Sequence, residues 1–213
     1  MLRVGLCVLV LALGACNKSD AGANHELAQT MLRERGAPDF ADASTDAFAA
    51  IRHEPSGMVC VLPPNGAFAF DVFPANAQNA GAQCSSTQDG VAVGWVAVRF
   101  STPTTLDAVF SASVAQLAAG LEPEAWPGQV SAADLQSPQG LVHYRIQRLQ
   151  APVGGEMQFL RVAVAERDGW YLQQIVSAPI ASAQEAETAA GEIWRQGLAR
   201  FSAPNVSDAA AAG

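Results

Sequence analysis

The sequence predicts an α+β fold, in which an antiparallel sheet of about six strands is flanked by two main amphipathic helices. Two observations carry this prediction. Several neighbouring segments have strand character, and Asp168-Gly169, typical of a type I′ hairpin turn, joins the last two. Apolar residues also recur at helical spacing in two stretches, over 106–121 and 186–201. Strands followed by a helix, twice over, are typical of a sheet that helices cover.

The first elements along the chain are expected to be helical. Residues 24–36 form a short amphipathic pattern, with Asn24 as its N-terminal cap and Gly36 as its stop. A further turn or two of helix is expected within 40–52, anchored by Phe48 and the following apolar residues. Strands follow this region.

The first group of strands is expected over 58–62, 67–73 and 91–100. The turn Pro63-Pro64-Asn65-Gly66 ends the first of them, and Phe68, Phe70 and Val72 alternate along the second. The polar stretch 76–90 is expected to be a loop.

Two helices and a second group of strands complete the prediction. Thr104 with Asp107 resembles a capping box before the first helix, and Ser182 with Glu185 resembles one before the last. Strands are expected over 142–149, 157–166 and 170–177, and residues 129–135 are a further candidate strand.

Composition narrows the classes of function. The chain has 213 residues, of which 50% are hydrophobic and 15% charged, which suits one folded domain. Its 20 acidic against 12 basic residues give a net charge of −8. Because nucleic-acid binding needs clustered cations, we expect no nucleic-acid partner.

The N-terminus has the pattern of a secretory signal. Arg3 precedes an apolar run over 4–13 that is too short to span a bilayer, and Leu13-Gly14-Ala15-Cys16 ends it. This ending resembles the lipobox of bacterial lipoproteins. The alternative is an ordinary signal peptide that has a cysteine near its end by chance.

The resemblance implies a lipid anchor at Cys16. In that family the signal, here residues 1–15, is removed, and the cysteine carries a diacylglycerol thioether and usually an acylated amine. Asn17 is not the aspartate that retains such proteins on the inner membrane, so the implied location is the periplasmic face of the outer membrane. We then expect a lipidated tether over 16–24, a single domain over 25–202 and a disordered tail over 203–213, with the lipid bilayer as one partner.

The order of the elements also looks somewhat like that of the PsbP/Mog1/DcrB-like fold. No motif supports this likeness, and it transfers no activity.

Cys60 and Cys84 remain once Cys7 leaves with the signal and Cys16 is lipidated. In an oxidising compartment such a pair is most simply a disulfide, which by the chain-entropy model contributes about 3.5 kcal/mol for a loop of about 25 residues. The alternatives are two free thiols or half of a metal site.

Known catalytic patterns are missing from the sequence. No Gly-x-Ser-x-Gly occurs, and His25-Glu26 lacks the second histidine of a zincin because Gln29 stands in its place. His53-Glu54 could form a pH-sensitive or ligand-contacting pair, although adjacent side chains point in different directions. We therefore expect no catalytic residue, no metal site, no cofactor and no enzymatic activity.

Two further features could contact a partner. His143, Arg145, Arg161 and Gln174 could form a polar binding face, or only an exposed strand face. Trp126 lies between prolines in an acidic loop and could anchor an interface or fold back over a sheet edge.

The sequence predicts a membrane-anchored periplasmic binding or scaffolding module of the cell envelope, with an envelope protein as a candidate partner. The alternatives are an envelope hydrolase with an unrecognised carboxylate site and a carrier of a small lipophilic ligand. A large apolar cavity would favour the carrier.

Overall fold

The main sheet of the protein has seven antiparallel strands. The computed structural model describes residues 21–63, 65–73, 79–136 and 143–201. The strands of the main sheet are β4 (Ala67–Phe73), β5 (Asn79–Gln88), β6 (Val91–Phe100), β7 (Glu124–Ala125), β8 (His143–Val153), β9 (Glu156–Arg167) and β10 (Trp170–Pro179). They lie in the order β4-β5-β6-β10-β9-β8-β7. The predicted α+β class and the antiparallel pairing are confirmed.

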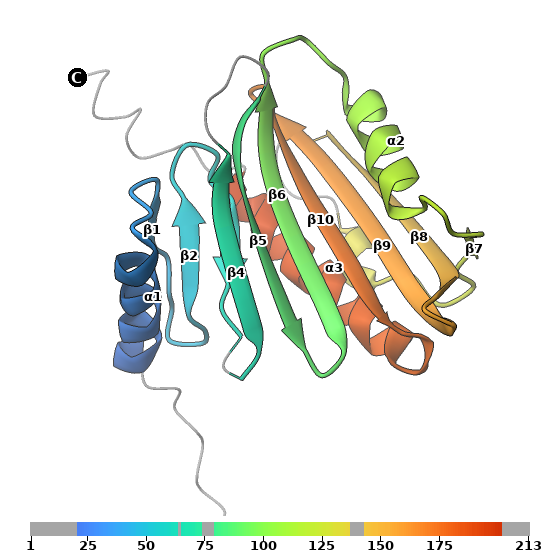
Figure 1. The fold of residues 1–213 in the computed structure, drawn as a ribbon, viewed down its shortest axis with the longest axis horizontal. Helices are drawn as coiled ribbons and strands as arrows, with labels where there is room; N and C mark the ends of the chain where they lie inside the picture. The colour runs from blue at the N-terminus through green and yellow to red at the C-terminus, as the bar shows by residue number, and fades with distance from the viewer. Residues whose placement is uncertain (1–20, 64, 74–78, 137–142, 202–213) are drawn as a thin grey trace, which may run out of the picture.

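The two main helices cover opposite faces of this sheet (Figure 1). Helix α2 (Leu106–Leu117) packs on β8 and β9, and helix α3 (Ala183–Phe201) packs on β9 and β10 from the other side. Both helices thus pack on one antiparallel sheet, as expected. Trp194 is 1% exposed and stacks on Trp95, whereas Phe110, Leu117 and Ile193, which we also expect to be buried, are only partly buried.

A second, three-stranded sheet stands beside the first, next to helix α1 (Ala21–Arg35). Its strands are β1 (Phe40–Asp42), β2 (Ala50–His53) and β3 (Val59–Val61). The expected strand over 58–62 is therefore present but belongs to this small sheet. The helical turns expected within 40–52 are wrong, because β1 and β2 pair with each other and the Ser44 hydroxyl is held between them by Ala50.

Helix α1 begins before Asn24, so that residue is not its cap. The Asn24 side-chain amide instead donates to the carbonyl oxygen of Thr45, at 2.9 Å. This bond ties the first turns of the helix to the loop between β1 and β2.

Strand β5 replaces most of the loop expected over 76–90. Its backbone is hydrogen-bonded on both sides, to β4 and to β6. Its side chains are small or polar, so it lacks the apolar alternation that marks a strand in a sequence, and Thr87 is its one β-branched residue. The neighbouring strands, rather than local propensity, make it extended.

The helix boundaries also differ from those expected. Thr105, not Thr104, caps α2 by accepting a hydrogen bond from the amide of Ala108. The candidate strand at 129–135 is instead the 3-10 helix η1 (Ala132–Leu135). Ser182 belongs to the 3-10 helix η2 (Ile180–Ser182), where its hydroxyl donates to Pro179, so it does not form the expected capping box.

The turn at Asp168-Gly169 forms as predicted. Both residues have positive φ, at 52° and 76°, which a type I′ turn requires. This turn sets the register of β9 against β10.

Several predictions fall on residues outside the described part of the chain. These are the signal peptide, Cys16, most of the tether and the C-terminal tail, so the expected domain boundaries stay predictions. Within the described residues, no helix is both long and apolar enough to cross a membrane.

Candidate functional site: an apolar pocket between the two sheets

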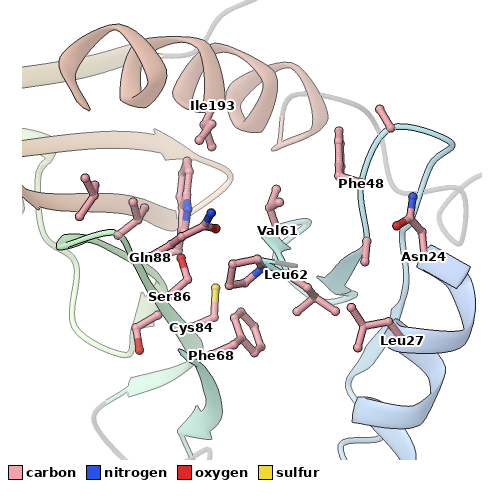
Figure 2. Close-up of a pocket in the computed structure, with 17 residues that line it drawn as sticks. Asn24, Leu27, Phe48, Val61, Leu62, Phe68, Cys84, Ser86, Gln88 and Ile193 are labelled. Carbon is pink, nitrogen blue, oxygen red and sulfur yellow. The ribbon is translucent and has the colours of Figure 1, made fainter. Parts of the chain in front are cut away.

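An apolar pocket of about 420 Å³ lies where the small sheet, α1 and α3 meet the β4–β5–β6 side of the main sheet. Figure 2 shows Ile193 of α3, Phe48 of the β1–β2 loop and Phe68 of β4 around it. Leu27 and Asn24, from α1, stand at its edge. The remaining lining residues are Ala47, Ala49, Val61, Leu62, Pro63, Cys84, Ser85, Ser86, Gln88, Val91, Val93 and Trp95.

The pocket exists because α3 covers only part of its face of the sheet. The helix packs mainly over β9 and β10. Alternate residues of β6, among them Val91, Val93 and Trp95, point to the same face and line the pocket beside the helix, where Trp95 stacks on Trp194. The small sheet covers this remainder without filling it, which leaves apolar surface facing a cavity.

None of the residues that line the pocket is charged. Among its polar groups are the side-chain amides of Asn24 and Gln88 and the hydroxyl of Ser86. Pockets of about 300–1,000 Å³ with mostly apolar walls and a few polar groups are typical of small-molecule sites. The lining therefore suits an apolar ligand with few, uncharged polar atoms.

The predicted disulfide forms part of this region. Cys60 of β3 and Cys84 of β5 are bonded, with their Cα atoms 6.3 Å apart, and Cys84 lies in the pocket wall. Because Cys84 lies in a strand and not in the expected polar loop, the bond joins the two sheets rather than pinning a loop. It fixes the two sides of the pocket relative to each other.

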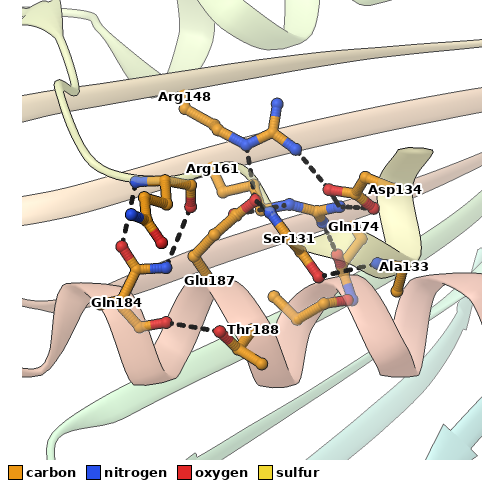
Figure 3. A network of polar contacts seen from close by, with 11 residues as sticks. Ser131, Ala133, Asp134, Arg148, Arg161, Gln174, Gln184, Glu187 and Thr188 are labelled. Atoms are coloured by element: carbon orange, nitrogen blue, oxygen red, sulfur yellow. Dashed lines mark hydrogen bonds and ion pairs between the residues drawn. The ribbon is translucent and has the colours of Figure 1, made fainter.

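A buried ion-pair network occupies the other end of the same sheet face (Figure 3). Arg161 of β9 donates from Nη2 to both carboxylate oxygens of Asp134, each at 3.0 Å, and from Nη1 to Gln174. Arg148, its neighbour on β8, bonds Glu187 of α3 from Nε at 2.6 Å and also bonds Asp134. Two arginines thus neutralise two carboxylates.

The burial of this network is nearly complete. The side chains of Arg161 and Glu187 are 0% exposed and that of Asp134 is 3% exposed. Burial lowers the pKa of Arg161, whereas Asp134 and Glu187 act in the opposite direction. Glu187 also accepts from the backbone amide of Ser131, which holds the segment before η1 against α3.

The polar binding face that the sequence suggested does not exist as one surface. His143 and Arg145 are exposed on the α2 side of the sheet, where Arg145 pairs with Asp107 at 3.1 Å. Arg161 and Gln174 are fully buried under α3. His143 and Arg145 therefore form part of an exposed strand face, whereas Arg161 and Gln174 lie on the opposite face of the sheet.

The sequence did not identify the network residues Asp134, Arg148 and Glu187, although the position of Glu187 indicates a buried partner. Glu187 falls on the same helical stripe as the buried Ala183, Ala190 and Trp194. A charged residue on an otherwise apolar stripe requires a buried partner. No spacing in the sequence shows that the partners are arginines on two separate strands.

The histidines form no metal site within the described residues, where no group of three or more metal-ligand side chains occurs. His53 is buried between Phe40 and Trp170, accepts or donates a hydrogen bond with Ser56 at 2.7 Å, and has its pKa lowered by burial. Glu54 points elsewhere and pairs with Arg52.

His25 lies near the surface at the start of the chain's described part. Its ring nitrogen Nδ1 lies 2.7 Å from the Asp42 carboxylate and so joins α1 to β1.

Trp126 packs back onto the molecule. Its ring centroid lies 4.7 Å from that of Phe159, and a Cβ atom on Gly128 would clash with its indole. The side chain is partly buried beside β9, which agrees with a tryptophan that folds back over the sheet. Contact between Trp126 and a partner stays a prediction.

Comparisons with known proteins leave the family open. No protein-family model matches the chain, and no curated protein matches its sequence. Among solved structures, LpqN, involved in cell envelope biogenesis of Mycobacterium tuberculosis, is similar at 9% identity and a TM-score of 0.35, covering 79% of this chain and 93% of that one.

Two other solved structures are similar at the same level. A protein of unknown function from Pseudomonas aeruginosa has 15% identity and a TM-score of 0.32, over 66% of this chain and 88% of that one. An uncharacterised protein from Mycobacterium smegmatis, the Rv0999 ortholog, has 13% identity and a TM-score of 0.28, over 84% of this chain and 98% of that one. Likenesses this weak carry no argument about fold family or function.

Proposed function

We propose that the protein is a non-enzymatic binding module of the bacterial cell envelope, anchored through lipidated Cys16, and that its folded domain holds a lipophilic ligand in the pocket between the two sheets. The observation that carries the proposal is the pocket itself, about 420 Å³ in volume and lined by apolar and uncharged polar side chains alone. A large apolar pocket is what distinguishes the carrier of a lipophilic ligand from a scaffolding module or a hydrolase.

The ion pairing of the buried carboxylates supports a binding function rather than a catalytic one. An acid–base hydrolase needs a carboxylate that reaches substrate in a cleft. Asp134 and Glu187, whose side chains are the most buried carboxylates among the described ion pairs, each bond both Arg148 and Arg161. Neither of them lines the pocket. The geometry therefore favours the carrier over the envelope hydrolase.

The test of ligand binding is titration with N-phenyl-1-naphthylamine, whose fluorescence rises in apolar surroundings. The full chain with Cys16→Ser provides protein without attached lipid. We expect saturable binding that Val93→Phe abolishes by filling the pocket. The matched control is Val96→Phe, on the same strand but on the opposite sheet face, which should bind as before. Equal binding by both variants would contradict the proposed site.

The anchor has its own test. Mass spectrometry of protein extracted from the membrane should find acyl groups on an N-terminal Cys16, and Cys16→Ser should prevent the modification. A mature chain that begins at another residue would refute the anchoring.

A further inference from the structure

The edge of the pocket lies close in the chain to the proposed anchor. Asn24 and Leu27, in the first two turns of α1, line the pocket, and α1 begins at Ala21. Five residue steps separate Ala21 from Cys16. A chain extends at most about 3.3–3.6 Å per residue, so the start of α1 stays within about 18 Å of an anchored Cys16.

This distance places the pocket edge near the lipid surface. It is shorter than the thickness of a bilayer's hydrocarbon core, which is about 30 Å. Leu27 is 40% exposed, so the apolar surface of the pocket continues onto the outside of the helix there. An acyl chain leaving the membrane would meet apolar side chains directly.

The charges of the protein disfavour binding of a lipid with an anionic head group. The pocket offers no arginine, lysine or histidine, and the chain as a whole carries a net charge of −8. An ion moved into such surroundings loses hydration without gaining a partner. Ser86 and Gln88 can instead bond ester carbonyls or hydroxyls, which are uncharged.

We infer that the pocket binds an acyl chain of an uncharged glyceride taken from the membrane surface next to the anchor. This inference rests on the proposed function, since it names the ligand class of the same site. The glyceride can be a free diacylglycerol of the bilayer or the diacylglycerol on Cys16 itself. In both, an acyl chain enters the apolar pocket while the ester groups stay at its polar edge.

The test uses the mature, lipidated protein reconstituted in phosphatidylcholine vesicles. These contain a trace of diacylglycerol with a photoreactive diazirine on one acyl chain, and peptide mass spectrometry locates the attached lipid after illumination. We expect attachment at Phe68, Val93 and Ile193. Phosphatidic acid with the same diazirine chain should label these residues several-fold less. Equal labelling by both lipids, or no label in the pocket of either this protein or the full chain carrying Cys16→Ser, would overturn the inference.

Comparison with the full chain carrying Cys16→Ser separates the two sources. If the free lipid is the ligand, both proteins are labelled in the pocket. If the protein's own anchor occupies the site, labelling is weak in the lipidated protein and rises in the Cys16→Ser chain. Either pattern supports a glyceride chain as the occupant.

A charge placed at the pocket edge provides a second measurement. Ser86→Asp lies on the pocket side of β5 and should reduce diacylglycerol labelling several-fold, whereas the adjacent Thr87→Asp, exposed on the other face, should not. An unchanged label in Ser86→Asp would count against the inference. If diacylglycerol does not label the pocket but N-phenyl-1-naphthylamine still binds, the ligand class alone is refuted. If neither the label nor the probe binds, the pocket is refuted as a binding site.

Discussion

One face of the main sheet carries two regions that differ in what they bury: one buries paired charged side chains, and the other leaves apolar side chains facing a cavity. At the β8–β9 end, charged side chains are buried, and each has a partner of opposite charge. At the β4–β6 end, the side chains are mostly apolar, and the space above them is left open. The same helix, α3, contacts both regions through Glu187 and Ile193.

The two regions are expected to contribute differently to stability and to ligand binding. Removing the partner of a buried charge strongly destabilises a protein, so the network favours one arrangement of η1, α3 and the two strands. An apolar cavity forgoes packing contacts that a filled core would have, and the surface left uncovered is available to a ligand. Loss of one charge in the first region should therefore destabilise the fold, whereas the proposed function requires the second region to take up a ligand without unfolding.

The largest expected effect follows removal of one charge from the network. Arg161→Met leaves Asp134 and Glu187 buried with one arginine between them and should lower the free energy of unfolding by about 3–5 kcal/mol. Urea denaturation followed by tryptophan fluorescence measures this loss.

The matched control is Arg145→Met on the neighbouring strand. Its ion pair with Asp107 has side chains that are 52% and 74% exposed, so the loss should stay below about 1 kcal/mol. Similar losses in the two variants would show that burial does not distinguish the two arginines.

The next effect concerns the disulfide that joins the small sheet to the main sheet beside the pocket. The double change Cys60→Ala with Cys84→Ala should lower stability by about 2–5 kcal/mol, because the unfolded chain loses its cross-link. Since the bond joins the two sheets beside the pocket, naphthylamine binding should weaken as well. Thermal denaturation and probe titration of the same sample test both effects, and unchanged binding would show that the small sheet keeps its place without the bond.

A smaller effect is expected where α3 meets the segment before η1. A Cβ atom on Gly191 would clash with the Ser131 hydroxyl and lie 2.5 Å from the Cβ atom of that serine. Gly191→Ala should therefore cost about 1–3 kcal/mol in overpacking, although alanine alone favours a helix. Adding Ser131→Gly should recover part of the loss, and strictly additive losses in a double-mutant cycle would contradict this contact.

The smallest expected effect is a dependence of stability on pH through His53. Burial lowers the pKa of His53 below its ordinary value of 6.5, while the charges of Asp39 and Glu54 oppose the shift. The unfolded chain therefore binds the proton more readily. The contribution to stability is present above pH 6.5 and is lost as the pH falls from there toward the folded pKa.

The variant His53→Phe should flatten this part of the pH profile. Phenylalanine can keep the ring contacts with Phe40 and Trp170 but cannot take up a proton. The exposed His143→Gln is the control for loss of any histidine. An equally steep profile in His53→Phe, measured by urea denaturation across the range in which a histidine titrates, would exclude His53 as the source.

The sequence by itself determined the α+β class, most strands, both main helices, the hairpin at Asp168-Gly169 and the pairing of Cys60 with Cys84. Each of these depends on local pattern, on turn chemistry or, for the cysteines, on the prediction that Cys7 leaves with the signal and Cys16 is lipidated. Apolar periodicity predicts which face of an element is buried, because that face must leave water whatever covers it.

Only the tertiary structure decided the identity of β5, the existence of the small sheet, the network and the pocket. Strand β5 is extended because two neighbours pair with it, although its small polar residues have little strand preference. Arg161 and Gln174 have polar side chains, as an exposed strand face would, yet both are buried under α3, where Asp134 and Glu187 pair with Arg161 and the Ala190 carbonyl accepts from Gln174. The pocket depends on where α3 stops covering the sheet, and that limit arises from the packing of segments far apart in the chain.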